Sequence, residues 1–222
     1  MTDSLAARLA AVRGGLPPGA RLLAVSKGQP LEAIRAAVAL GQRSFGESRL
    51  QEAMAKQAAL AAVDPAAPPL DWHFIGRLQA NKARGVLRHF GTIHSVDSLE
   101  LAARLQRIAA EEGLAPALFA QVKFRPDAAK AGFSPTELRA LRPQLAAMAP
   151  LRLVGLMTIP PLGLSPTERL ALYGEAAALA ADLELPELSM GMSDDWREAA
   201  AAGATWVRLG TALFGARQAL QP

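Results

Sequence analysis

The sequence has no cysteine, one tyrosine and three histidines. Without cysteine the chain forms no disulfide, thiolate metal site or cysteine nucleophile, which predicts a reducing, cytoplasmic setting. His89 and His94 are not spaced with carboxylates as metal ligands are, so we expect no metal site. No segment approaches ~20 uninterrupted apolar residues, and no basic start precedes an apolar run at the N-terminus. We therefore expect a soluble, unprocessed chain with no membrane partner.

A strong excess of either charge is also lacking. Lys and Arg total 24 against 20 Asp and Glu, a net charge of +4 at pH 7. Because basic residues alternate with acidic ones and form no stripe, we do not expect nucleic acid as a partner. The basic group Arg77, Lys82, Arg84 and Arg88 is interpreted as a solvated helix face. The alternative is that this group steers a phosphorylated ligand.

What the chain does contain is a regular alternation of two kinds of segment. Short apolar runs are followed by longer stretches whose apolar residues recur every three or four positions, which indicates strand and helix in turn. The candidate strands number eight, as in a (β/α)8 TIM barrel. We therefore predict one α/β barrel domain over residues 1–222. The candidate strands are Arg21–Ser26, Arg43–Gly46, Trp72–Ile75, Thr92–Val96, Ala117–Lys123, Arg152–Thr158, Pro186–Met190 and Trp206–Leu209.

Helix starts support this interpretation. Ser134 and Ser165 are each followed by Pro at the first helical position and by Glu three residues on, the pattern of a capping box. An additional helix over Ser4–Val12, stopped by Gly14-Gly15, is expected to lie outside the barrel and cover its bottom or side.

Lys27 directly follows the first apolar run. In a parallel barrel the active face lies at the carboxyl ends of the strands, so this amine is expected there. Partial burial lowers the pKa of a lysine and makes the neutral amine available for a Schiff base. The alternative is an ordinary lysine whose stem packs at a strand end while its amine reaches water.

The stretch from Leu188 to Arg217 covers the last two strands, where barrels bind phosphate. Ser189, Gly191 and Ser193 cluster after the seventh strand, and Ser193-Asp194-Asp195 is predicted to open a helix with free N–H groups. Gly210-Thr211, at the end of the eighth strand, supplies a close backbone approach and a hydroxyl. A plain N-cap at Ser193 and a plain turn at Gly210 are the alternatives.

Arg208 places a permanent cation within the apolar eighth strand. Its expected partner is a pyridine nitrogen, and the alternative is an internal carboxylate such as Glu47. Because Arg only donates hydrogen bonds, a pyridine nitrogen facing it stays unprotonated, which weakens the ring as an electron sink.

Taken together, these motifs resemble the YggS/PROSC family of pyridoxal 5'-phosphate (PLP) homeostasis proteins. The resemblance rests on Leu22–Lys27, Phe45–Glu47, Trp72–Gln79 with Asn81-Lys82, Gly155–Met157 and Leu188–Arg217. It implies a monomeric or weakly associating barrel similar to the N-terminal domain of alanine racemase, with PLP bound to Lys27. It also implies phosphate ligands at Ser193, Gly210 and Thr211, with Ser189 and Met192 in the adjoining loop, and Arg208 facing the pyridine nitrogen.

Two departures from the family pattern concern the ring. Ser48 stands where Asn usually follows Phe45-Gly46-Glu47, and Lys123 stands where Asn is common, although Lys130 and Gly132 are kept. We therefore expect weaker contacts to the side of the ring than to the phosphate.

Three functions can explain a Schiff-base lysine beside a phosphate site: a PLP carrier that buffers the cofactor and passes it to apo-enzymes, a PLP enzyme such as a racemase, and a PLP-free aldolase. The aldolase is disfavoured because its lysine generally lies on a later strand. Racemisation needs a base on each face of the substrate carbon. The only tyrosine, Tyr173, falls in the helix after the sixth strand, and we expect no racemase β domain after the barrel. No chemistry is assigned to His73, so we expect a carrier without rapid catalysis.

Overall fold

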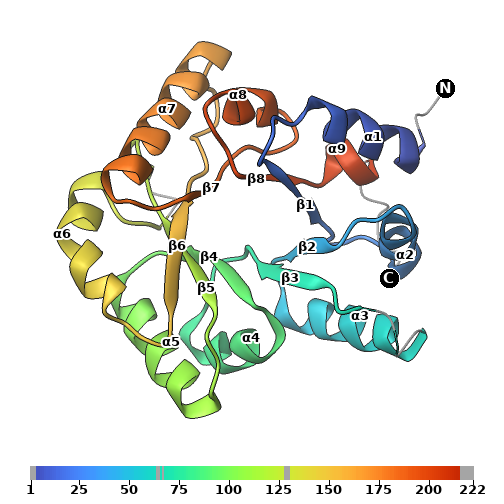
Figure 1. Cartoon of the computed structure of the whole chain (residues 1–222), viewed down its shortest axis with the longest axis horizontal. Helices are drawn as coiled ribbons and strands as arrows, with labels where there is room; N and C mark the ends of the chain where they lie inside the picture. The colour runs from blue at the N-terminus through green and yellow to red at the C-terminus, as the bar shows by residue number, and fades with distance from the viewer. Residues whose placement is uncertain (1–3, 64–65, 67, 128–130, 216–222) are drawn as a thin grey trace.

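Eight parallel strands close into a barrel in chain order, with the eighth pairing to the first (Figure 1). The computed structural model describes residues 4–63, 66, 68–127 and 131–215. All eight expected strands are present, which confirms the TIM barrel, and their bounds differ from the expected ones by two residues at most. The strands are β1 (Arg21–Val25), β2 (Ser44–Glu47), β3 (Asp71–Phe74), β4 (Thr92–Val96), β5 (Ala117–Gln121), β6 (Arg152–Met157), β7 (Glu187–Ser189) and β8 (Trp206–Leu209).

Helices surround the barrel (Figure 1). They are α1 (Leu5–Gly15), α2 (Leu31–Ala39), α3 (Leu50–Val63), the short 3-10 helix η1 (Ala80–Lys82), α4 (Ala83–His89), α5 (Leu99–Glu112), α6 (Pro135–Ala146), α7 (Pro166–Asp182), α8 (Trp196–Ala201) and α9 (Thr211–Phe214). Both predicted capping boxes are confirmed, at Ser134 with Glu137 and at Ser165 with Glu168.

Helix α1 is the predicted additional helix, and it extends three residues further than expected. It packs beside α9, where Arg8 Nε donates a hydrogen bond to the Leu213 carbonyl at 2.6 Å. Because α9 has only four residues, α1 covers the side of the barrel there. Gly15 ends the helix tightly against Trp196, since a Cβ on Gly15 would lie 2.9 Å from that ring.

Side chains alternate between two faces along each strand. On β1, Leu22 and Ala24 join the large apolar cluster between sheet and helices, while Leu23 points into the barrel with Phe119, Met157 and Trp206. The interior is completed by the buried polar side chains of His73, His94, Ser189 and Arg208. The barrel therefore has an apolar outer layer and a partly polar lumen.

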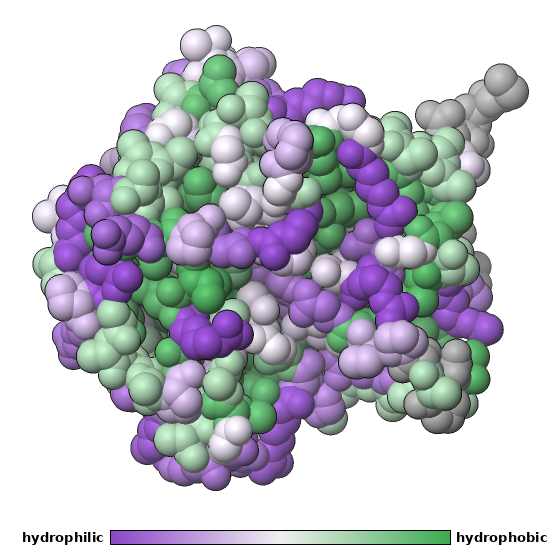
Figure 2. Space-filling model, in the orientation of Figure 1, coloured by the Kyte–Doolittle hydropathy of each residue, from purple (hydrophilic) through white to green (hydrophobic). Residues whose placement is uncertain are grey.

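The surface seen in Figure 2 mixes hydrophilic and hydrophobic residues without a continuous stripe of either. Large apolar side chains with substantial exposure are scattered, for example Met54, Leu162 and Leu170. Within the described residues, no helix combines the length and the apolar character needed to cross a bilayer.

The pairing of β6 with β7 predicts a position that requires glycine. A Cβ on Gly155 would lie 2.1 Å from the Glu187 carbonyl oxygen, so Gly155→Ala must separate the two strands. We expect this variant to lose about 1–3 kcal/mol of unfolding free energy. The matched control is Gly174→Ala on the exposed side of α7, where a Cβ meets nothing within 4 Å and stability should rise by up to ~1 kcal/mol. Urea unfolding of both variants measures the difference, and equal stabilities would contradict the close packing.

Candidate functional site

A cavity of about 270 Å³ lies at the carboxyl ends of the strands. Six of the seven residues expected in the site line it together: Lys27, Met192, Ser193, Arg208, Gly210 and Thr211. Its apolar wall comes from Val25, Ile75, Met157 and Ile159. The cavity therefore brings an amine and a guanidinium to the same apolar pocket.

Lys27 is placed by the end of β1. Strand β1 is buried up to Val25, and Lys27 itself is half-buried at the cavity. Gly28 then adopts a left-handed conformation with φ of +69°, which costs glycine little and allows the chain to turn away. The structure thus places Lys27 at the carboxyl end of β1, at the cavity.

A buried ionic network behind Lys27 was not found from the sequence. The ammonium of Lys56 donates to the Ser26 carbonyl at 2.7 Å, to Glu47 Oε1 at 2.8 Å and to Glu52 Oε1 at 2.6 Å. Glu52 Oε1 also accepts the Gly28 N–H at 2.5 Å. The network therefore holds the peptide groups on both sides of Lys27. The signal available in the sequence was the spacing of Glu52 and Lys56, four residues apart on one helix.

The two carboxyl groups of this network differ in their electrostatics. Burial raises the pKa of Glu47 and outweighs the hydrogen bonds from Lys56 and Ser26, which lower it. Burial also raises the pKa of Glu52, but the hydrogen bonds from Lys56 and the Gly28 N–H outweigh it, so the net shift is downward. Glu47 Oε2 is buried with no hydrogen-bond partner in the described part of the chain. Lys56 is thus the cation on which both groups depend.

The loops after β7 and β8 form the opposite side of the cavity. Ser193 Oγ accepts the Ala212 N–H at 3.1 Å, which ties the two loops together. The backbone N–H groups of Ser193, Asp194, Gly210 and Thr211 have no hydrogen-bond partner among the described residues. Unpaired N–H groups converging from two loops favour an anion.

The predicted helix start in this region is wrong. Helix α8 begins at Trp196 with Asp195 at the N-cap, so Ser193 precedes the helix and is not its cap. The physical reason is that Asp195 Oδ1 accepts the Met192 N–H at 2.6 Å and closes a turn first. Gly191 makes this turn possible with φ of +88°, and a Cβ there would lie 2.6 Å from Ala199 Cβ.

Arg208 is 5% exposed and faces the cavity from β8. Its Nη1 donates to Ser189 Oγ at 2.7 Å and its Nη2 to the Thr158 carbonyl at 3.0 Å. The alternative prediction, that Arg208 pairs with Glu47, is wrong, because the Glu47 carboxylate accepts hydrogen bonds from Ser26 and Lys56. Burial lowers the pKa of Arg208 to about 10, so the guanidinium stays charged at neutral pH.

Ser189 is the one expected site residue that does not line the cavity. It is the last residue of β7 and is fully buried, with its hydroxyl between Arg208 and His94 Nδ1, 2.7 Å from each. Its side chain points into the lumen because of the alternation along the strand. Ser189 therefore supports Arg208 from behind.

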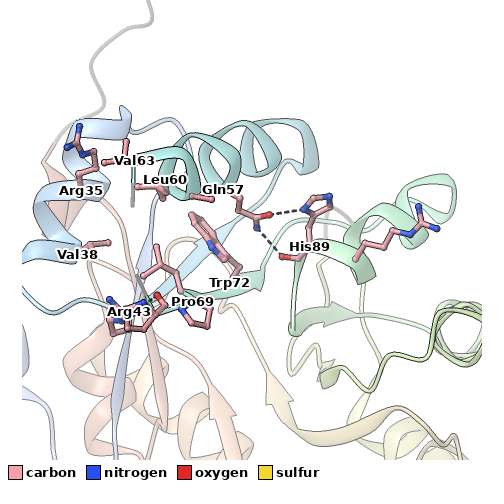
Figure 3. Close-up of a pocket in the computed structure, with 13 residues that line it drawn as sticks. Arg35, Val38, Arg43, Gln57, Leu60, Val63, Pro69, Trp72 and His89 are labelled. Carbon is pink, nitrogen blue, oxygen red and sulfur yellow. Dashed lines mark hydrogen bonds between the residues drawn. The ribbon is translucent and has the colours of Figure 1, made fainter. Parts of the chain in front are cut away.

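A second cavity, of about 480 Å³, lies at the side of the barrel between α2, α3, β3 and α4 (Figure 3). Trp72 and Leu60 contribute apolar surface to it, and Gln57 is joined to His89 by two hydrogen bonds (Figure 3). Its lining residues, all of them described, include no lysine. This cavity therefore offers no Schiff-base amine, and the candidate site remains the one at Lys27.

Comparison with known proteins agrees with this geometry. A family model of the alanine racemase N-terminal domain matches residues 1–218. The pyridoxal phosphate homeostasis protein of Synechocystis sp. is 50% identical over 208 residues, which cover 91% of this chain and 94% of that protein. The chain belongs to the pyridoxal phosphate homeostasis protein family. The resemblance deduced from the sequence motifs is thereby confirmed.

Other members of the pyridoxal phosphate homeostasis protein family are similar over most of the chain. The protein of Pseudomonas aeruginosa is 48% identical and covers 90% of this chain, with 86% of its own length matched. The structure of PipY from Synechococcus elongatus with PLP bound is 52% identical, with a TM-score of 0.89 over 96% of this chain and 100% of PipY. An alanine racemase from Clostridium difficile, at 16% identity and a TM-score of 0.71, shares the fold, and 56% of its chain is covered.

The departures from the family pattern lie away from the cavity lining. Ser48 packs on Gly76, where a Cβ would meet the Ser48 carbonyl at 2.3 Å. Lys123 lies beside Gly132. Neither Ser48 nor Lys123 lines the cavity. The remaining motif residues Lys130 and Arg217 lie outside the described residues.

The basic group expected on a helix face is partly neutralised. Arg84 pairs with Glu111 and Glu112, and Arg88 pairs with Glu112 at 2.7 Å. Among the residues that the structure describes, no group of three His, Asp or Glu lies close enough to hold a metal ion.

The network behind Lys27 generates a stability prediction. Lys56→Met leaves the buried Glu47 carboxyl group without its cation and removes the closer of the two cations of the partly buried Glu52, so we expect unfolding free energy to fall by about 3–5 kcal/mol. The control is Arg107→Met, which removes an exposed ion pair with Glu111 at the same four-residue spacing and should cost below ~0.5 kcal/mol. Denaturant titration compares the two. A loss at Lys56 no larger than the control would show that the network does not stabilise the turn.

Proposed function

We propose that this chain carries PLP as a Schiff base on Lys27 and buffers or delivers the cofactor inside the cell. The observation that carries the proposal is the convergence of Lys27, Arg208 and the unpaired N–H groups of two loops on one cavity. Membership in the pyridoxal phosphate homeostasis protein family supports it, as does PipY, a member solved with PLP bound.

The chemistry of the cavity fits each part of PLP. The amine of Lys27 matches the aldehyde, the N–H groups around Ser193 and Gly210 match the dianionic phosphate, and the apolar wall matches the ring. When bound, PLP supplies a reactive carbonyl and an electron-withdrawing ring. Arg208, a donor only, would face the ring nitrogen and favour its unprotonated form.

The residues present favour a carrier over a racemase. Tyr173 is fully buried in α7, and burial, followed by the charge of Asp195, raises the pKa of its hydroxyl. It therefore cannot serve as a base on the second face of a substrate carbon. A ring nitrogen held unprotonated also weakens carbanion stabilisation. We propose that residues 1–222 act as one monomeric, cytoplasmic unit that passes PLP to apo-enzymes and turns over amino acids slowly, if at all.

Replacement of Lys27 tests the attachment. Lys27→Ala should abolish the visible absorbance band of the Schiff base, while the free energy of unfolding changes by less than ~0.5 kcal/mol, because a half-buried strand-end side chain adds little to the core. Borohydride reduction of the wild type followed by peptide mass spectrometry should find PLP on Lys27. The control, Lys123→Ala, should keep the band. PLP found mainly on another lysine would refute the assignment.

The phosphate end is tested separately. Thr211→Ala should weaken PLP retention through loss of a charge-assisted hydrogen bond, on the order of 1.5–3 kcal/mol, while Thr211→Ser should retain it. Ser193→Ala should add a similar loss and also free the Ala212 N–H. Equilibrium dialysis measures the dissociation constant of each variant. Unchanged affinity in the double variant with Ala at both positions would place the phosphate elsewhere.

A further inference from the structure

A continuous line of hydrogen bonds crosses the barrel lumen from Arg208 to the opposite end of the strands. Beyond Ser189, His94 Nε2 lies 2.8 Å from His73 Nδ1, and His73 Nε2 lies 2.6 Å from Asp71 Oδ2. Asp71 is the first residue of β3, and its side chain is 48% exposed. The two imidazoles between are buried, at 0% and 2% exposed. Strands β3 and β4 thus share one polar chain with strands β7 and β8.

The ends of this chain favour one direction. Arg208 can only donate, so Ser189 Oγ accepts from it, and the hydroxyl hydrogen of Ser189 is then available to His94 Nδ1. His94 then carries its hydrogen on Nε2 and donates to His73 Nδ1, and His73 in turn donates from Nε2 to the Asp71 carboxylate. In this arrangement each imidazole carries one hydrogen and serves as one donor and one acceptor.

The surroundings agree with this protonation. His94 stacks on Phe119, with ring centroids 4.3 Å apart, and its complete burial, reinforced by the nearby cation of Arg208, holds the pKa of His94 well below its usual range. At the other end, burial opposes ionisation of Asp71, but hydrogen bonds from His73 and Ser44 outweigh it and lower its pKa.

Further charged groups lie near both ends of the hydrogen-bond chain and stabilise the charges of Asp71 and Arg208. Arg21 lies close enough to lower the pKa of Asp71 further, and its guanidinium also stacks 4.1 Å over Trp206. Arg21 is itself paired with Glu187. Near the cavity, Asp195 and Tyr173 act electrostatically on Arg208. The chain therefore has a fixed cation at one end and a fixed anion at the other.

We propose that Asp71, His73, His94 and Ser189 are positioning residues that fix the guanidinium of Arg208 toward the cavity through a one-directional chain of hydrogen bonds. This inference rests on the proposed function in one respect, that Arg208 faces the ring nitrogen of PLP. The chain holds Nη1 on Ser189, the Thr158 carbonyl holds Nη2, and the remaining N–H groups are left for the ligand. Asp71 and His73 do not line the cavity and so act only through the hydrogen-bond chain, whereas His94 also lines the cavity, which makes Asp71 the cleaner position for a test.

The direction of the chain is tested on the protein without PLP. Nitrogen-15 NMR of the imidazoles at pH 7 should show His73 and His94 neutral with the hydrogen on Nε2. The protein has only three histidines, so the signal that disappears in His89→Gln is that of His89, and the other two belong to His73 and His94. His94 with its hydrogen on Nδ1, or charged at this pH, would overturn the proposal. This measurement stands whether or not the protein binds PLP.

The positioning role is tested on the loaded protein. His94→Phe keeps a ring against Phe119 but breaks the chain, and PLP should dissociate about tenfold more readily; Asp71→Asn, remote from the cavity, should cost about threefold. Both should shift the nitrogen-15 resonance of the ring nitrogen of labelled PLP. Asp182→Asn, which removes a surface partner of Arg139, is the control.

The two proposals fail in different ways. Asp71→Asn and His94→Phe with affinity and resonance equal to the control would overturn the positioning role while PLP carriage stands. Wild-type protein that binds no PLP would refute the proposed function, and the NMR result on the unloaded protein would still decide the direction of the chain.

Discussion

The polar side chains of the barrel lumen are arranged around the buried guanidinium of Arg208. A cation taken out of water is costly unless hydrogen bonds replace its hydration. No described carboxylate pairs directly with Arg208. Compensation comes from a hydroxyl, a backbone carbonyl and the more distant Asp195, and His94 and Asp71 complete the hydroxyl's own hydrogen bonding. Without a direct ion pair, Arg208 keeps donors for a ligand.

On the Lys27 side of the cavity, direct ion pairs supply the support that Arg208 lacks. The side chain of Lys27 must be able to move, while its backbone must be held in place. The backbone is held by the buried ion network around Lys56, whose residues do not line the cavity. Lys56 joins β2, α3 and the turn after β1, so the backbone around Lys27 is fixed by elements on its own side of the barrel. The cation at Arg208 and the turn at Lys27 are therefore supported independently, and a change at one support need not move the other.

Much of this site could be predicted because parallel strands end at one edge. Lys27, Gly210 and Thr211 each close an apolar run, so the barrel alone brings them together. Lys56 could not be predicted, since a lysine on an amphipathic helix normally indicates a solvated face and its burial depends on carboxylates from other elements. His94 was missed as a partner because it lies 21 residues from His73 and 95 from Ser189. The helix start was predicted at Ser193, two residues too early, because Asp195 closes the turn and takes the N-cap position instead.

The polar chain also bears on how the barrel itself is stabilised. The interior of a (β/α)8 barrel is normally filled by layers of branched apolar side chains. Here Leu23, Phe119, Met157 and Trp206 share the lumen with two imidazoles. Buried polar groups cost stability unless every donor and acceptor is satisfied. In the proposed direction every link of the chain is satisfied, so the chain favours a single arrangement of the lumen, and the apolar layer between sheet and helices must supply the greater share of stability.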